Sequence, residues 1–375
     1  MRQLFYIFVF CSCLGLFGQG FRNSGNFQLH EGAAVGFHTN IDNDGVYTSN
    51  ANTLTGFYGN TAITYTGANA FNTFDLEMFN QVGVFAENTI TIANNLNFIN
   101  GTLFTPNTNP NIVIDFGNTG FFNGENDDNK VNGYAAMANQ QNFTFPVGDA
   151  LFLRSLILRS DVANTFSQCA YFSEDPANPL SIEQSFDPEA KSNTIGEISS
   201  REFWILTGNA SSNVTLGWNV RSNLASIALE LEDVIVVGWS KAANQWINLG
   251  NAMAGGDLNE GFVTSNDFVP NDFEVLTLAA APLPLDNFAL QNPTLGNYFV
   301  SPNGDGINDV LVIDNLAASP NNVVRIFNRL GQKVFEQNNY VNEFGGVANS
   351  GGFIPNKEIG LPEGVYYYTA SLFDL

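Results

Sequence analysis

Short apolar runs of strand length, separated by Gly and Asn, fill the chain from residue 21 to residue 148, and no helical period is sustained anywhere. Typical runs are Asn88–Ala93 and Asn111–Phe116, in which β-branched apolar residues dominate. Runs of this length bounded by turn residues are typical of β-strands. The pattern predicts an all-β, multi-domain protein.

Two β architectures fit residues 21–148. Short, closely spaced strands with Asn-Gly corners are typical of the coils of a β-helix, although these runs have no fixed repeat length. An antiparallel sandwich accommodates the same pattern. We therefore keep both a β-helix and a sandwich as predictions for this region.

Longer and clearer strand patterns follow in residues 149–281, such as Leu151–Leu158 and Asp233–Trp239. Turn residues separate these patterns at the intervals usual in sandwiches. We predict a middle antiparallel β-sandwich that begins after residue 148. The segment Ala281–Asp286 alternates Pro and Leu, which predicts a short, stiff linker over residues 282–298.

The last part of the chain, residues 299–375, again alternates apolar and polar positions. Val323–Phe327 and Lys333–Glu336 flank a turn at Asn328–Gly331, which predicts a β-hairpin. Val310–Ile313 and the tyrosine-rich run Val365–Phe373 read as further strands. Together they predict a small immunoglobulin-like β-domain.

A polar loop, Phe299–Asp309, opens this domain. Pro fixes one φ angle, the two glycines permit positive φ, and the Asn and Asp side chains can close turns on their own backbone. We interpret the loop as a rigid motif. Its residues are Ser301, Pro302, Asn303, Gly304, Asp305, Gly306, Asn308 and Asp309.

Four ordered motifs in this region, SPNGDGIND, VVRIFNRLGQKVFE, NEFGG and LPEGVYYY, resemble the gliding-motility-associated C-terminal domain, the type B sorting domain of Bacteroidetes type IX secretion. The resemblance covers residues 299–375. It implies that the type IX machinery exports the chain across the outer membrane to the surface or the medium, and it implies no catalytic activity. Members usually continue past the tyrosine-rich strand, whereas this sequence stops at Leu375, so we expect a signal that is incomplete at its end.

The N-terminus also indicates export. Residues 1–20 combine the basic Arg2 with an apolar core and small residues near Gly20, as in a cleaved signal peptide. After cleavage we expect no transmembrane span. Of the three cysteines only Cys169 then remains, so no disulfide framework is possible, and we predict that Cys169 is a buried apolar residue of the strand Phe166–Phe172.

The net charge of the chain limits the classes of function that it can have. The 375 residues include 13 Lys and Arg against 36 Asp and Glu, a formal net charge of -23. Nucleic-acid binding needs a basic surface to neutralise phosphates, so this class is excluded. The chain also has no nucleophile-elbow, zinc-protease, phosphate-loop or paired-cysteine motif, and we predict that it is not an enzyme.

Calcium is the cofactor that the sequence favours. Asn40, Asp42 and Asp44 place oxygen atoms at alternate positions before a glycine, as in the first half of an EF-hand loop. A second candidate set repeats this spacing in the C-terminal loop and comprises Ser301, Asn303, Asp305 and Asp309. Neither set has a Glu at the twelfth position, which excludes a full EF-hand. A turn closed by its own Asn and Asp side chains is the alternative at both places.

The tryptophans are the candidates for a sugar-binding platform. Trp204, Trp218 and Trp239 stand inside apolar strands, so we expect them in the core. We expect Trp246 to be exposed and assign it as the candidate ligand-binding residue.

The sequence thus predicts an exported structural or adhesive surface protein. A glycan-binding module or a carbohydrate-active enzyme of the cell surface is the alternative. The expected partners are the type IX machinery and an extracellular glycan or other cell-surface ligand.

Overall fold

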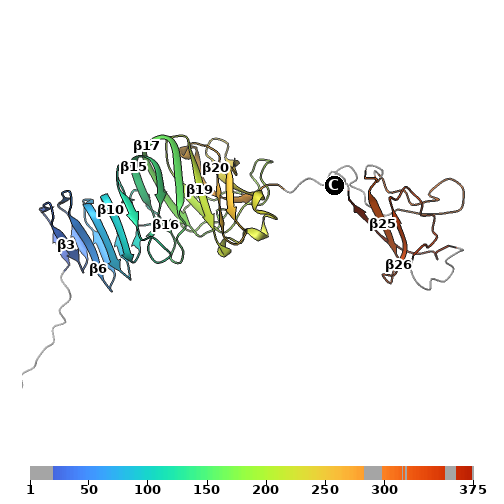
Figure 1. Ribbon diagram of the computed structural model, residues 1–375, viewed down its shortest axis with the longest axis horizontal. Coiled ribbons are helices and arrows are strands. Elements are labelled where there is room, and N and C mark those ends of the chain that lie inside the picture. The colour runs from blue at the N-terminus through green and yellow to red at the C-terminus, as the bar shows by residue number, and fades with distance from the viewer. Residues whose placement is uncertain (1–19, 283–297, 315, 317–318, 351–359, 374–375) are drawn as a thin grey trace, which may run out of the picture. The chain divides into compact units, whose positions relative to one another are not determined.

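A computed structural model describes residues 20–282, 298–314, 316, 319–350 and 360–373 (Figure 1). Nearly all of the predicted signal peptide and of the predicted linker lies outside these residues. The chain divides into two compact units, one ending at Pro282 and one beginning at Leu283. Among the described residues, no helix has the length and apolar character needed to span a membrane.

The first unit is built of strands and four short 3-10 helices. The strands up to residue 148 are β1 (Phe21–Asn23), β2 (Asn26–Leu29), β3 (Ala34–Phe37), β4 (Ile41–Asn43), β5 (Val46–Ser49), β6 (Leu54–Gly59), β7 (Ile63–Thr66), β8 (Phe71–Asn80), β9 (Val84–Ala86), β10 (Ile90–Asn100), β11 (Leu103–Phe104), β12 (Ile114–Asp115), β13 (Phe121–Asn123), β14 (Val131–Asn132), β15 (Ala135–Phe145) and β16 (Val147–Gly148). The elements that follow are β17 (Leu156–Phe172), β18 (Phe203–Leu206), β19 (Ser212–Trp218), η1 (Val220–Ser222), η2 (Leu224–Ser226), η3 (Leu231–Asp233), β20 (Val234–Ser240), β21 (Gln245–Gly250), β22 (Met253–Gly256), β23 (Gly261–Thr264), η4 (Pro270–Asp272) and β24 (Phe273–Ala280).

The N-terminal region is a parallel β-solenoid, so the β-helix alternative is confirmed. One face stacks β1, β4, β7, β9, β11, β14 and β16 in parallel register. A second face runs through β2, β5, β8, β10, β12 and β15, and a third through β3, β6, β8, β10 and β13. Strands β8 and β10 are long enough to contribute to both of these faces.

The coils differ in length. Paired positions are only 16 residues apart from Val131 to Val147 but 28 residues apart from Leu103 to Val131. Inside the coils, apolar side chains from successive coils stack on one another, as Tyr47 and Phe71 do with ring centroids 3.9 Å apart. The core is therefore regular even though the repeat is not.

Buried asparagines join neighbouring coils. The Asn23 side chain donates to the Asn43 side chain at 2.7 Å, and Asn43 in turn donates to the backbone oxygen of Asn69 at 3.3 Å. At another corner Gly101 has a φ of 123°, and a Cβ there would lie 1.9 Å from the Asn80 oxygen. The Asn and Gly of the sequence thus allow the tight corners.

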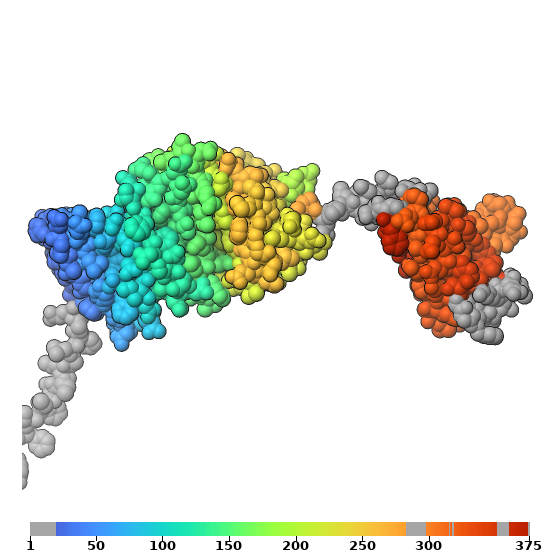
Figure 2. Space-filling model, viewed as in Figure 1, coloured from blue at the N-terminus to red at the C-terminus, as the bar shows by residue number. Residues whose placement is uncertain are grey.

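The solenoid passes into an antiparallel sandwich at β15, which pairs in parallel with β12 and antiparallel with β17. The C-terminal half of β17 continues into β18, β24, β20 and β21, here named the capped sheet. The N-terminal half continues into β19, β23 and β22, here named the groove sheet. Inward side chains of both sheets and of the solenoid form one hydrophobic core, and Figure 2 shows one continuous body.

The acidic segment between β17 and β18 covers the outer face of the capped sheet. Its Phe186, Ile195 and Ile198 pack on a second hydrophobic cluster, which includes Trp239 and Trp246. The segment also exchanges backbone hydrogen bonds with Trp246, whose N–H donates to the Ala190 oxygen at 2.8 Å. The expectation that Trp246 is exposed is therefore wrong, because its side chain is 0% exposed beneath this cover.

Two other predictions for this region are confirmed, whereas of the predicted strand Leu151–Leu158 only the last three residues belong to a strand, the start of β17. The side chains of Trp204, Trp218 and Trp239 are buried, and Cys169 is a free, fully buried residue of β17. Burial raises the pKa of the Cys169 thiol well above its ordinary value. A thiol in this position is inert.

The second unit contains a three-stranded antiparallel sheet in the order β26, β25, β27, formed by β25 (Asn322–Phe327), β26 (Lys333–Asn338) and β27 (Tyr367–Leu372). This confirms the hairpin and the tyrosine-rich strand. Residues 310–313 form no strand, although Leu311 and Ile313 are buried in this unit's own hydrophobic core. Tyr340 holds the segment in place, because its hydroxyl donates to the Leu311 oxygen at 2.5 Å. The immunoglobulin-like kind of fold stays a prediction.

Candidate binding groove and sorting loop

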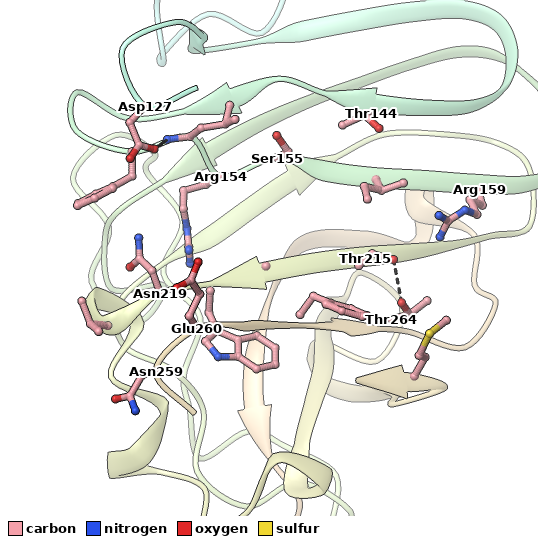
Figure 3. Close-up of a pocket in the computed structure, with 18 residues that line it drawn as sticks. Asp127, Thr144, Arg154, Ser155, Arg159, Thr215, Asn219, Asn259, Glu260 and Thr264 are labelled. Atoms are coloured by element: carbon pink, nitrogen blue, oxygen red, sulfur yellow. Dashed lines mark hydrogen bonds between the residues drawn. The ribbon is translucent and has the colours of Figure 1, made fainter. Parts of the chain in front are cut away.

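A groove of about 780 Å³ lies on the outer face of the groove sheet (Figure 3). Its floor follows from the strand register. One row of outward positions crosses the sheet through Thr144, Ile157, Thr215, Thr264 and Met253. Because successive side chains of a strand point to opposite faces of the sheet, these side chains point outward and their neighbours point into the core.

Glycines shape the groove. At Gly217 in β19 an added Cβ would meet only the Gly261 oxygen, at 3.6 Å, so the missing side chain leaves the floor open. At Gly255 an added Cβ would lie 2.7 Å from a ring carbon of Phe262. The Phe262 ring therefore lies against the bare backbone of β22, and it keeps 38% of its surface exposed.

Polar groups stand at both ends of the groove. In Figure 3, Arg159 lies at one end, and Asp127, Asn219, Asn259 and Glu260 lie toward the other. Between them the hydroxyls of Thr215 and Thr264 share a hydrogen bond of 2.8 Å. The groove thus combines an aromatic face, hydroxyls, amides and charges of both signs, which is the usual make-up of a site for a polar ligand.

A buried ion pair supports the wall of the groove. Arg154, which lines the groove, pairs with Glu202, and both side chains are nearly inaccessible. Tyr171 donates its hydroxyl to the Glu202 carboxylate at 2.7 Å, and Ser222 accepts from Arg154 at 2.8 Å. The network ties the start of β17 to β18 and to η1, so it fixes the position of the groove wall.

A second ion pair lies beside it. Arg221 donates to the Asp149 carboxylate at 2.6 Å, and its guanidinium lies 4.7 Å from the centre of the Phe152 ring. Partial burial opposes ionisation of Asp149, but hydrogen bonds from the Phe152 and Leu151 amides and from Arg221 outweigh it and lower the pKa of Asp149. Asp149 therefore holds the loop before β17 as a carboxylate.

The first predicted calcium set is engaged within the protein. Arg22 pairs with Asp42 at 3.5 Å and with Asp44 at 2.9 Å, and the Asn40 side chain accepts from the Thr64 amide at 2.9 Å. The three residues lie along β4 and its ends rather than around a loop. In the part of the chain that the structure describes, no group of three or more His, Cys, Asp or Glu side chains could hold a metal ion.

The second set closes its own turns, as the alternative interpretation expected. Both carboxylate oxygens of Asp309 accept backbone N–H groups, from Gly304 at 2.7 Å and from Gly306 at 2.8 Å. Asp305 is held by the side chain of Asn303 and by the Ile307 amide. These hydrogen bonds lower the pKa of both carboxyls. Positive φ at Gly304, Gly306 and Asn308 completes the loop. Calcium binding at either set stays a prediction.

The groove was not predicted from the sequence. The single Thr in each of β15, β19 and β23 was a signal, but its meaning depends on which strands pair. The glycine pair at Gly255 and Gly261 was a second signal, since both positions make room for aromatic rings. Trp246, the residue that the sequence favoured, lies on the other sheet.

Comparison with known proteins identifies only the C-terminal region. Residues 294–374 match the family model described as the CHU_C type IX secretion signal domain. None of the curated proteins and none of the solved structures that were compared matches this chain. The match confirms the resemblance carried by the four C-terminal motifs. It indicates that this is a secreted cell-surface protein, sorted by the type IX machinery and exported to the surface or the extracellular space.

Proposed function

We propose that this protein is a non-catalytic, adhesive component of the cell surface. In this proposal the solenoid and the sandwich are displayed at the surface, and residues 299–375 are the sorting signal. The groove on the outer face of the groove sheet is the observation that carries the adhesive role. It has the volume of a ligand site, it is lined by an exposed aromatic ring and by hydroxyl and amide side chains, and it lies on a rigid sheet.

Adhesion fits the groove better than catalysis. Two carboxylates line it, Asp127 and Glu260, but Asp127 already accepts a hydrogen bond from the Leu153 amide at 2.9 Å. Glycoside hydrolysis needs two carboxylates free to act on either side of one bond. We therefore expect the groove to hold its ligand without cleaving it.

A blocking variant tests this function. Cells that export the full chain are compared with cells that export Gly217→Phe, which places a ring in the groove, or Gly217→Ala, whose single methyl meets only ordinary contacts. We expect wild type and Gly217→Ala to be retained on the same surface polysaccharides, Gly217→Phe to be washed off, and no new sugar ends to appear. Equal retention of all three would contradict an adhesive role for the groove, and release of sugar ends by wild type would contradict a non-catalytic one.

A further inference from the structure

One cation in the groove has no partner. Arg159 lies on the outer face of β17 with its side chain exposed, and within the described ranges its guanidinium makes no ion pair or hydrogen bond. The chain has only 13 Lys and Arg against 36 Asp and Glu. The other arginine of the groove, Arg154, is already paired with Glu202. Arg159 is thus the group in the groove that is ready to receive an anion.

The register places Arg159 in line with the rest of the groove. Outward positions follow each other along β17 from Arg159 to Ile157, and along β19 from Asn213 to Thr215 to Gly217. The row of Arg159 is therefore four residues, about 13 Å, from the row of Gly217. That distance accommodates a short chain of sugar rings across the open floor.

The groups between the two ends suit sugar hydroxyls. Thr144 presents a half-exposed hydroxyl, and the mutually bonded hydroxyls of Thr215 and Thr264 line the floor with little of their surface exposed. Phe262 offers an exposed ring for the apolar face of a sugar. Asn259, exposed near the far end, adds an amide. A ligand with many hydroxyls and one well-placed carboxylate would satisfy the whole set.

We infer that the groove binds an acidic glycan, with a uronic-acid carboxylate on Arg159 and the following sugar rings over the threonine row and Phe262. This inference rests on the proposed adhesive function and names its ligand class. The carboxylate pairs with the guanidinium through charge-assisted hydrogen bonds, and the hydroxyls and ring faces of the following sugars contact side-chain hydroxyls and the aromatic ring.

An acidic peptide could also pair with Arg159, but extended peptides do not usually bind to the face of a sheet. Extended peptides bind by adding a strand to an exposed sheet edge, where free backbone groups receive them. The groove lies on the face of the sheet, and its strands β17, β19 and β23 are paired on both sides. A peptide backbone would find few partners there, whereas sugar hydroxyls find side-chain hydroxyls and amides.

Titration calorimetry of the full chain tests the inference. The probes are hexamers of galacturonate, of mannuronate and of a glucuronate-containing glycan, each measured beside the same hexamer with its carboxyl groups reduced to alcohols. The salt concentration is 0.15 M, at which the screening length is about 8 Å and distant charges of the protein count little. We expect at least one acidic hexamer to bind at least about tenfold more tightly than its reduced form.

Variants assign the effect to the groove. Arg159→Gln should abolish the preference for the acidic form, and Arg159→Lys should keep part of it. Arg201→Gln, which removes the same charge from an exposed arginine outside the groove, should change nothing. Equal affinity for acidic and reduced hexamers, or an unchanged preference in Arg159→Gln, would overturn the acidic specificity and leave the adhesive function standing. No binding of any hexamer, with wild-type cells still retained on polysaccharide and Gly217→Phe cells lost, would also overturn the inference alone.

Discussion

Individual carboxylate and amide side chains close loops and join neighbouring coils in this protein. Asp309 closes the sorting loop on two backbone amides, Asp149 closes the loop before β17, and Asn43 joins neighbouring coils. The same residue types make the chain strongly acidic. Where a carboxylate accepts several N–H groups its charged form is favoured, so local turn structure depends on pH.

Asp149 gives the clearest pH dependence. Its pKa in the folded protein is lower than the ordinary 3.8, so its stabilising contribution is complete above that value and is lost as the pH falls through the folded pKa. We expect Asp149→Asn to lower the melting temperature at pH 6, and the difference from wild type to shrink below about pH 4. Thermal unfolding of both proteins from pH 3 to pH 7 measures this. A difference that stays constant across the range would show that the Asp149 charge plays no part.

The buried pair Arg154 and Glu202 gives a larger effect. Glu202→Gln leaves a guanidinium without its counter-charge at a position that water hardly reaches, which costs about 3–5 kcal/mol of unfolding free energy. Replacing both partners with apolar residues, as in Arg154→Met with Glu202→Leu, should restore much of the loss. Urea unfolding followed by tryptophan fluorescence compares the three proteins. A single variant as stable as wild type would contradict the role given to this pair.

At the scale of elements, strand patterns in the sequence predicted the hairpin β25–β26, the strand β27 and the sandwich strand β20, but they placed the start of β17 five residues too early. They left solenoid and sandwich open for residues 21–148, because both architectures use short strands and the coil spacing varies between 16 and 28 residues. Trp246 was placed wrongly for a related reason. Its strand has a polar flank, but the segment before β18 folds over that face, and no local pattern shows a cover that is distant in sequence.

The asparagine contacts between coils allow a prediction for the solenoid. Asn43 is fully buried, so Asn43→Ala removes one acceptor of the Asn23 amide and leaves the Asn69 oxygen without the hydrogen bond from Asn43, which should cost about 1–3 kcal/mol of unfolding free energy. Asn123→Ala removes a similar contact at an exposed position and should cost less than about 0.5 kcal/mol. Denaturant titrations followed by far-ultraviolet circular dichroism measure both. Equal costs would argue against burial as the source of the effect.

At the scale of the molecule, each of the two units has a hydrophobic core of its own, and the two units have different tasks. One core runs without interruption from the solenoid into the sandwich, and the other belongs to the C-terminal unit that carries the type IX signal. Sequence motifs predicted the sorting signal because short linear patterns define it. The groove could not be predicted in this way, because it depends on how strands between residues 142 and 264 align.

Localisation in a native type IX host tests the central claim, that the C-terminal unit exports the rest. Cells expressing the full chain or a chain that lacks residues 299–375 are fractionated and treated with protease. We predict that the full chain is at the surface or in the medium and that the shortened chain accumulates in the periplasm, with its folded part intact. Export of the shortened chain, or retention of both chains in the periplasm, would contradict the account.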